Sequence, residues 1–505
     1  MVSINELTGI THHYLALALL ACLAVVLCIR SFIRALFSPL RSVPGPFLAR
    51  FTRLWYLWKV WRGDFQKTNI ELHRRYGPVV RITPYDYSID DPSAVKPIYG
   101  HGTAFTKGPW YDASRNLDAV ARDLFTDRDP KRHAANRRKV ASLYSMSSLL
   151  KMEEAVNECV GLVEEKFHEI ARSGGAIDLQ WWLQCYAFDV IGAITIAKRF
   201  GFLDRGEDAF GLIRGLEGFL TYMANVGIYS EIHPILCKLT GSSANGGLAH
   251  AFAFASKNIQ ERVESNKKGK RPETDDFLTK VLRLHEEQPH NFGMEDVLMT
   301  CSANVVAGSD TTSISLSAIM WGLIKNPEAM AKLRTEVDEK LAKGEISDPV
   351  TFADAQKMPY LQAVIQEGLR THPATGLPLG RAVPERGVRI AERFFPEGAV
   401  VGINSWVAHY NKDVFGDDAD LFRPERWLAD KEAVHKMGAY FLPFGHGSRT
   451  CIGKNISLME MSKLVPQLVR KFDFHLDDPY AELQLHNAWF VKQKNFMVRV
   501  TERKV

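Results

Sequence analysis

One cysteine of this chain lies in a short glycine-rich stretch, Phe444-Gly445-His446-Gly447-Ser448-Arg449-Thr450-Cys451-Ile452-Gly453. A single thiolate framed by small residues is suited to bind a haem iron, because a thiolate pushes electron density onto iron and favours cleavage of the O–O bond of dioxygen. Gly447 and Gly453 allow the backbone to approach a flat cofactor and to donate N–H groups to the sulfur. Arg449 lies where a cation can meet a haem propionate. The alternative is a buried structural cysteine, the usual environment of a lone Cys.

The spacing within this stretch resembles the haem-binding signature of the cytochrome P-450 family, F-x-x-G-x-R-x-C-x-G. All fixed positions of that signature are present: Phe444, Gly447, Arg449, Cys451 and Gly453. The resemblance implies that Cys451 is the axial ligand of a haem b iron and that the other four residues help to hold the haem. The tripeptide Gly445-His446-Gly447 does not predict a dinucleotide-binding loop, because Thr450 stands where the third glycine would be.

Length and composition fit a large globular enzyme. The 505 residues are 46% hydrophobic and 24% charged, which is enough for a sizeable core. The seven cysteines are scattered without C-x-x-C spacing, which favours a reducing compartment over a disulfide framework or a zinc site. The net charge is +5, yet the first 62 residues alone carry seven Lys or Arg and one acid. This local basic excess favours a membrane surface, and not nucleic acid, as its partner.

The N-terminal region carries a long apolar segment. Residues 14–29 are apolar without interruption, and residues 32–37 extend the segment past Arg30 and Arg34. A spanning helix needs about 20 residues, and arginines near its end can reach the headgroups. A cleaved signal peptide is the alternative, but no basic residues precede the apolar run. We expect a single-pass anchor over residues 1–40, a proline-rich hinge over 41–46 and a haem-binding monooxygenase domain over 47–505, on the cytoplasmic side of the endoplasmic reticulum membrane.

Residues 293–325 form the longest periodic segment and predict a buried helix. Its centre, Ala307-Gly308-Ser309-Asp310-Thr311-Thr312, is poor helix-forming sequence, and polar groups are costly in a core, which favours a bulge that admits a ligand or water. The centre resembles the family's oxygen-binding motif, A/G-G-x-D/E-T-T/S. The resemblance implies that Asp310 relays protons and that Thr311 hydrogen-bonds dioxygen and its water. The alternative is hydroxyls bonded to carbonyls of their own helix.

Residues 127–145 predict a basic helix in which His133 and Arg137 lie four residues apart on one face. The resemblance implies that both meet a haem propionate. It also implies that the remaining cations form a docking patch for an acidic electron donor: Lys131, Arg132, Arg138 and Lys139. The alternative is an ordinary solvated charged face.

A further pair of motifs resembles the family's E-x-x-R helix and P-E-R-F segment. The first lies in a predicted helix over 361–371 and the second in Phe422-Arg423-Pro424-Glu425-Arg426-Trp427. Together they imply a buried structural network of Glu367, Arg370 and Arg426. An exposed salt bridge, which is worth little, is the alternative. Arg381 matches a position that often contacts a propionate.

The predicted fold class is mainly α with small β-sheets, an α+β cytochrome P-450 fold preceded by an N-terminal transmembrane helix. Short strands are expected near residues 79–82, 388–390 and 496–500, and a loop over 241–247. The resemblance spans essentially residues 44–500 and is closest to the fungal microsomal type similar to pisatin demethylase, through the stretches 107–111, 449–459 and 489–493.

The implied activity is that of a monooxygenase that oxidises a lipophilic small molecule by hydroxylation, epoxidation or demethylation in secondary metabolism. The chain shows no credible nucleotide-binding fingerprint. Electrons are therefore expected from NADPH through a separate cytochrome P-450 reductase, with cytochrome b5 as a possible helper. Three alternatives stay open: a haem-thiolate isomerase or dehydratase without external electrons, detoxification of a foreign compound, and a haem sensor or inactive scaffold.

The family's layout also gives candidates for the substrate pocket. An aromatic or alanine on a helix is more often simply core, so we expect about half of the candidates to touch a ligand. Their character predicts an apolar, aromatic-walled cavity. The candidates are Trp110, Tyr111, Phe219, Tyr222, Met223, Ala303, Ala307, Thr375, Leu377 and Trp489.

Overall fold

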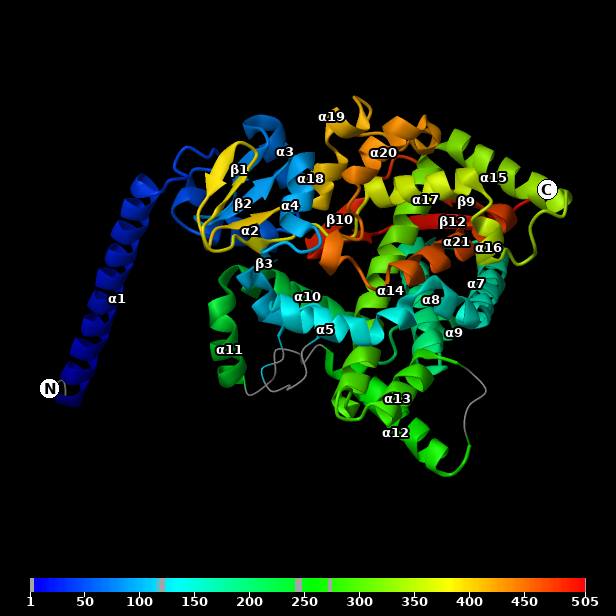
Figure 1. Ribbon diagram of the computed structural model, residues 1–505, viewed down its shortest axis with the longest axis horizontal. Helices are drawn as coiled ribbons and strands as arrows, with labels where there is room; N and C mark the ends of the chain where they lie inside the picture. The colour runs from blue at the N-terminus through cyan, green and yellow to red at the C-terminus, as the bar shows by residue number, and fades with distance from the viewer. Residues whose placement is uncertain (1–3, 116, 118–122, 241–247, 271–274, 505) are drawn as a thin grey trace.

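The computed structural model describes residues 4–115, 117, 123–240, 248–270 and 275–504. The loop predicted for residues 241–247 lies outside these ranges. Helices make up most of the body (Figure 1). Strands β1, β2 and β3 lie toward the side from which the N-terminal helix α1 projects, whereas β9 and β12 lie on the opposite side, near the C-terminus (Figure 1). The mainly α architecture with small sheets is therefore confirmed.

The helices differ widely in length, from four-residue turns to the long helices that cross the body. Their bounds are α1 Ile4–Phe37, α2 Leu54–Trp61, α3 Phe65–Tyr76, α4 Val95–Tyr99, α5 Pro130–Val140, α6 Met146–Leu149, α7 Glu153–Ser173, α8 Leu179–Ile196, α9 Phe202–Arg205, α10 Leu212–Val226, α11 His233–Thr240, α12 Ala249–Lys267, α13 Phe277–Glu287, α14 Met294–Lys325, α15 Pro327–Ala342, α16 Phe352–Ala355, α17 Pro359–Thr371, α18 Ser405–His409, α19 Lys412–Phe415, α20 Lys431–Ala439 and α21 Lys454–Lys471.

The strands are short and form small sheets. Their bounds are β1 Val79–Arg81, β2 Asp86–Ile89, β3 Thr106–Lys107, β4 Ala176–Asp178, β5 Arg381–Ala382, β6 Val388–Ile390, β7 Arg393–Phe395, β8 Val400–Gly402, β9 Phe472–Leu476, β10 Gln484–Ala488, β11 Phe490–Lys494 and β12 Met497–Glu502. One sheet has the order β1-β2-β8-β5-β3, in which only the β2–β8 pair is parallel. A second has the order β4-β12-β9, and β6–β7 and β10–β11 are hairpins. The three predicted strands correspond to β1, β6 and β12.

The long helix α14 runs through the middle of the body and packs against α8, α12, α13, α17 and α21 (Figure 1). Its bounds match the predicted segment closely. Asp296 accepts a hydrogen bond from the backbone N–H of Gly293 at 2.8 Å, which caps the start of the helix, and Pro327 follows the last turn. A helix that is apolar on most faces can be buried only by neighbours on all sides, which is the arrangement seen.

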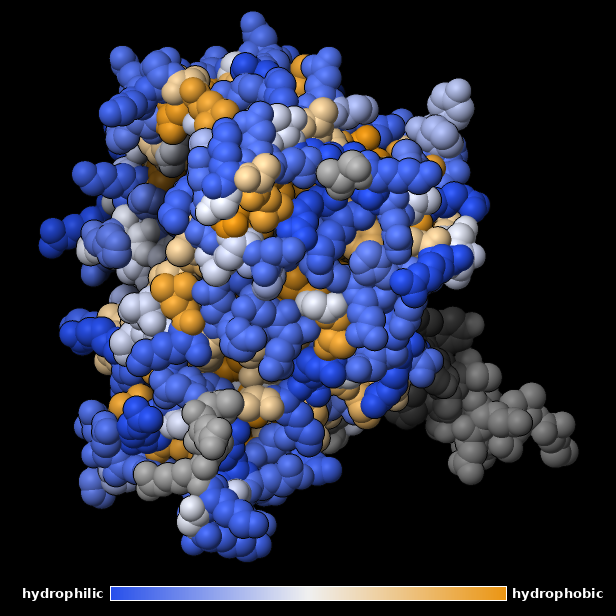
Figure 2. Space-filling model, turned by 90° about the vertical axis from the view of Figure 1, so that its right-hand side faces the viewer, coloured by the Kyte–Doolittle hydropathy of each residue, from blue (hydrophilic) through white to orange (hydrophobic). Residues whose placement is uncertain are grey.

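Two clusters of buried apolar residues hold the body together. One lies among the helices and includes residues of α7, α8, α14 and α21, and the other lies beside the five-stranded sheet. Hydrophilic residues cover most of the face in Figure 2, where hydrophobic residues form small separate groups. In the described parts of the chain, no helix combines the length and apolar character needed to cross a membrane. The anchor predicted for residues 1–40 is therefore not confirmed.

Candidate active site

The cysteine loop precedes α21 and is shaped by glycines. The N–H of Cys451 donates to the carbonyl of Phe444 at 2.8 Å, which closes the loop. Gly447 has φ +64°, and a Cβ added there would lie 1.9 Å from the carbonyl oxygen of Tyr99. Only glycine fits this close approach without displacing backbone. The loop therefore packs against the end of α4 in a way that fixes where Cys451 points.

The Cys451 side chain is accessible although it lies deep in the molecule. Burial raises the pKa of its thiol, while N–H groups of Gly453 and Lys454 and the charge of Arg137 act in the opposite direction. Donors aimed at sulfur stabilise a thiolate. The donor set thus fits a sulfur that binds a metal, and Gly453 contributes a donor from the position that the sequence indicated.

One face of α14 is accessible within the body. Ala303 and Ala307 are exposed and Thr311 is partly exposed, whereas neighbouring Val305 and Asp310 are buried. Small side chains at four-residue spacing lie on one side of a helix. This face leaves room for a ligand beside Thr311.

The polar centre of α14 differs from the sequence-based expectation. The helix continues through it without a break, so the expected bulge is not present. The Thr311 hydroxyl donates to the carbonyl of Ala307 at 2.8 Å, and Ser309 and Ser315 bond in the same way to carbonyls four residues earlier. Hydroxyls can satisfy themselves within their own helix, which removes the need for a bulge.

Asp310 lies on the buried side of the same helix. Its carboxyl accepts a hydrogen bond from the side-chain amide of Gln184 on α8. Burial raises the pKa of the Asp310 carboxyl, and the nearby charge of Lys492 opposes that rise. Asp310 thus keeps its proton to higher pH than an exposed aspartate would.

Three buried or half-buried cations, Lys107, Arg381 and Arg449, gather near the cysteine loop. Arg449 donates to the carbonyl of Asp127 at 2.7 Å, and Lys107 donates to that of Phe125 and lies 4.2 Å from the ring centre of Tyr111. Burial and the charge of Arg381 lower the pKa of Arg449 to about 10 and also lower that of Lys107.

In the described part of the chain these three cations donate to backbone carbonyl groups and form no ion pair with a carboxylate. Positive groups repel one another strongly in a low-dielectric interior, and an anion bound between them would relieve this repulsion. Haem b carries two propionate carboxylates, so the cluster fits the acidic edge of that cofactor. The N–H groups directed at the Cys451 sulfur and the cluster of three cations therefore both fit a bound haem.

The two predicted residues of α5 lie in different surroundings. His133 is buried, and burial together with the charges of Arg449 and Lys107 lowers the pKa of its imidazole to about 3. It is therefore neutral at pH 7 and can offer a propionate a hydrogen bond but no charge. Arg137 is half-buried, and its positive charge lowers the pKa of the Cys451 thiol.

Aromatic side chains form one wall near the cation cluster. Trp110 stacks on Trp489 with ring centres 4.3 Å apart, and Tyr111 and Phe125 pack against Trp489 edge-on. Leu377 and Phe219 are buried, and Thr375 forms a backbone bridge to Phe490. The structure thus brings Trp110, Tyr111 and Trp489 together.

Tyr222 differs from the other pocket candidates. Its hydroxyl is bonded to His233 of α11 at 2.9 Å. This hydrogen bond links α10 to α11, and the half-buried Tyr222 stays a candidate for the pocket.

The Glu367 carboxylate joins two segments that are far apart in the sequence. It pairs with Arg370 at 2.7 Å and with Arg426 at 2.9 Å, and all three side chains are almost fully buried. Trp427 adds an indole N–H at 2.9 Å, a contact that the sequence did not reveal. The carboxylate is thus satisfied on both oxygens, as a buried charge requires.

Sequence reasoning missed two residues of this region, Lys107 and Gln184. Lys107 belongs to a short stretch without periodicity, and only the fold places it beside Arg381 and Arg449. Gln184 had a weak signal in the sequence, since a polar amide stands there within a largely apolar helical segment.

Comparisons with known proteins agree with this geometry. The family model described as cytochrome P-450 matches residues 44–500. The chain belongs to the cytochrome P-450 family. It is 38% identical over 461 residues to pisatin demethylase of Fusarium vanettenii, which covers 90% of this chain and 88% of that protein. It is 35% identical to the cytochrome P-450 monooxygenase gsfF of Penicillium aethiopicum, over 92% of this chain and 94% of that protein. The predicted kinship with fungal enzymes similar to pisatin demethylase is confirmed.

Membership of the family defines the class of chemistry. The chain is a cytochrome P-450 monooxygenase, an oxidoreductase whose cofactor is haem b. The residues that the structure brings together around Cys451 fit that cofactor.

Replacing Glu367 by Ala should cost about 3–5 kcal/mol of unfolding free energy, because two buried guanidinium groups lose their carboxylate. Guanidinium chloride unfolding of the haem-loaded protein measures this loss. Lys343→Ala is the control, since the Lys343–Glu339 pair is exposed. Equal stability of the two variants would show that the Glu367 network is dispensable.

Replacing Lys107 by Met should speed haem loss roughly tenfold, the equivalent of one charge-assisted hydrogen bond to a propionate. Transfer of haem to excess apomyoglobin measures the rate. Lys131→Met, at an exposed position of α5, should leave it unchanged. Identical rates in the wild type and Lys107→Met would remove Lys107 from the haem site.

Proposed function

We propose that this monooxygenase oxidises a lipophilic small molecule with electrons that a separate reductase takes from NADPH. The observation that carries the proposal is the accessible Cys451 sulfur, toward which the N–H groups of Gly453 and Lys454 point. A bound haem with a thiolate ligand supplies the activation of dioxygen and the transfer of one oxygen atom to the substrate. The protein contributes position and proton control.

Cys451 would be the axial ligand, with Phe444, Gly447 and Gly453 shaping its loop. Arg449, Arg381, His133 and Lys107 would hold the propionate edge, and Arg137 would stabilise the thiolate. The mutual repulsion of the cations supports this assignment, because an anion between them relieves it.

Asp310 and Thr311 would control the protons that the reaction consumes. Asp310 is buried and its pKa is raised, so it keeps its proton to higher pH than an exposed aspartate and would deliver and regain that proton. Thr311 directs its O–H at the carbonyl of Ala307, which leaves its oxygen free to accept a hydrogen bond.

The substrate would lie between the aromatic wall and the accessible face of α14. Trp110, Tyr111 and Trp489 offer flat apolar surfaces, and the exposed Ala303 and Ala307 leave space beside α14. A terpenoid, polyketide or aromatic compound of secondary metabolism fits such walls. The name of pisatin demethylase supports demethylation among the reactions to be tested.

Electrons would enter on the side of α5. Lys131 and Arg138 are exposed there, and Arg137 of the same helix acts on Cys451. Exposed cations steer an acidic partner to this face. A reductase, and cytochrome b5 as a second donor, are the partners that this charge suits.

We also propose that the chain works at the endoplasmic reticulum membrane. Large apolar side chains are exposed along α1 and near α2, interleaved with the N-terminal arginines, and such a surface favours lipid. The exposed apolar residues include Phe32, Ile33, Leu36, Phe37, Phe47, Leu48, Leu54, Trp58 and Trp61.

Deletion of the gene in the source organism, with comparison of metabolite masses, tests the function. A compound that accumulates and is one oxygen lighter than a vanished product indicates hydroxylation or epoxidation, and one that is a methylene heavier indicates demethylation. The purified haem-loaded chain should convert that compound only with NADPH and reductase, and isotope-labelled dioxygen should appear in a hydroxylated product. The chain should sediment with microsomes.

Full turnover without NADPH and reductase would contradict the proposal and favour an isomerase or dehydratase. An unchanged metabolite profile would direct the test to foreign compounds, with pisatin as the first probe.

A further inference from the structure

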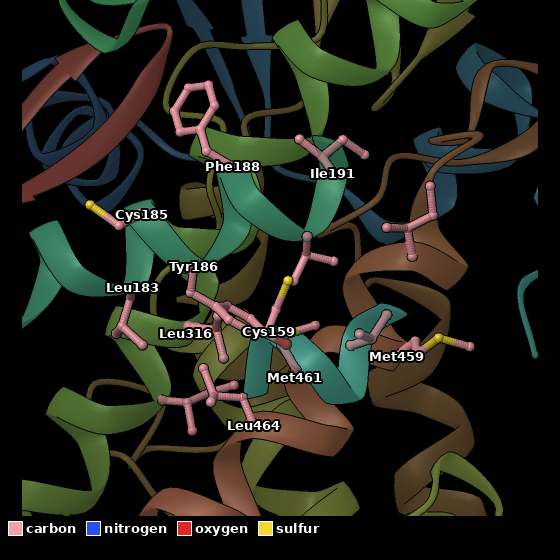
Figure 3. Packing of buried hydrophobic residues seen from close by; sticks show 14 of the residues in the cluster. Cys159, Leu183, Cys185, Tyr186, Phe188, Ile191, Leu316, Met459, Met461 and Leu464 are labelled. Carbon is pink, nitrogen blue, oxygen red and sulfur yellow. The ribbon is translucent and has the colours of Figure 1, made fainter. Parts of the chain in front are cut away.

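Helix α8 carries two buried glutamines on one side. Gln180 and Gln184 are four residues apart, and both are almost fully buried. Figure 3 shows their neighbours Leu183, Cys185 and Tyr186 within a densely packed apolar cluster with α14 and α21. A buried amide is costly unless it is hydrogen-bonded, so these two side chains need polar partners.

The partner of Gln184 is the Asp310 carboxyl. The Gln184 Nε2 group donates to Asp310 Oδ1, while Gln184 Oε1 accepts from Gln180 Nε2 at 3.5 Å. The second contact favours the orientation in which the Nε2 end of the Gln184 amide faces α14. Gln184 therefore presents a donor, and not an acceptor, to Asp310. Within the described ranges, no other group is hydrogen-bonded to this carboxyl.

We propose that Gln184 is a positioning residue for proton delivery, which holds Asp310 Oδ1 against α8 so that Oδ2 exchanges the proton. This inference rests on the proposed function, in which Asp310 supplies protons. A carboxyl anchored through one oxygen keeps a fixed orientation, and general acid catalysis depends on such geometry. The anchor comes from a rigid helix that packs along α14.

Two charged groups near Asp310 have opposite effects on its pKa, so the uncharged Gln184 is left as its direct partner. Lys492 of β11 favours the ionised carboxyl, and Glu217 of α10 opposes it. These two groups pair with each other, which reduces their net influence on Asp310. Burial has the largest effect and raises the pKa of Asp310, whereas the hydrogen bond from the Gln184 amide lowers it. Loss of this donor should therefore raise the pKa of Asp310.

Infrared difference spectroscopy of the haem-loaded protein tests the proposal as a function of pH. The C=O band of protonated Asp310 is identified by its absence in Asp310→Asn. In Gln184→Met this band should move to higher frequency, and its midpoint should rise by about one pH unit, because a hydrogen bond to the carboxyl is lost.

Gln493→Met is the matched control. Gln493 is also buried and donates to the carbonyl of Ile314 on α14, but in the described structure it forms no hydrogen bond with Asp310. The control should leave the band and its midpoint unchanged. If Gln184→Met does not fold, Gln180→Met is the substitute test. Loss of the Gln180 side-chain amide would allow the Gln184 amide to turn away from Asp310. The Asp310 band should then shift in the same direction.

A second readout follows reductant use in the loaded enzyme with reductase. Gln184→Met should release more hydrogen peroxide per NADPH than Gln493→Met, and the added Gln184 change should have no effect in Asp310→Asn. An Asp310 band unchanged by Gln184→Met would overturn the inference even if the wild type is an active monooxygenase. A shifted band in a wild type without that activity would overturn the proposed function alone.

Discussion

The buried Glu367 carboxylate is the interaction on which the position of the active site depends. It holds Arg370 of its own helix and Arg426 from a segment more than fifty residues later. Arg370 in turn donates to the carbonyls of His409, Ala419 and Leu421, which ties down the irregular chain between α18 and the cysteine loop. Such a buried charge is stable only while every partner is present, so the network admits one arrangement of this segment.

The connection reaches the cysteine loop through His409. Its Nδ1 lies 3.1 Å from the carbonyl of Arg370, and its Nε2 accepts the N–H of Leu442 at 2.8 Å. Leu442 lies two residues before Phe444, whose carbonyl closes the loop around Cys451. Burial and the charge of Arg370 lower the pKa of His409 to about 3, so the imidazole stays neutral and can accept this bond. The ion network thus determines where the sulfur lies relative to α14.

Much of this arrangement could be predicted from the sequence because it rests on local pattern. The cysteine loop depends on glycines at fixed spacing, and α14 and α17 depend on apolar periodicity with proline at their boundaries. Contacts between distant segments carry no such pattern. Lys107 and Gln184 gain their meaning only when the fold places them beside Arg449 and Asp310. The hydrogen bond between Tyr222 and His233 had no signal in the sequence for the same reason, since His233 belongs to another helix. The bulge expected in α14 is absent because hydroxyls bond to carbonyls of their own helix.

We propose that Cys451 binds the haem iron as a thiolate. The absorption spectrum of the reduced, carbon monoxide-bound protein tests it most directly. The wild type and Cys237→Ser should show the long-wavelength Soret band of a thiolate-ligated haem, and Cys451→Ser should lack it while still folding. A Cys451→Ser protein that keeps the band, or a haem-loaded wild type that never shows it, would contradict the account.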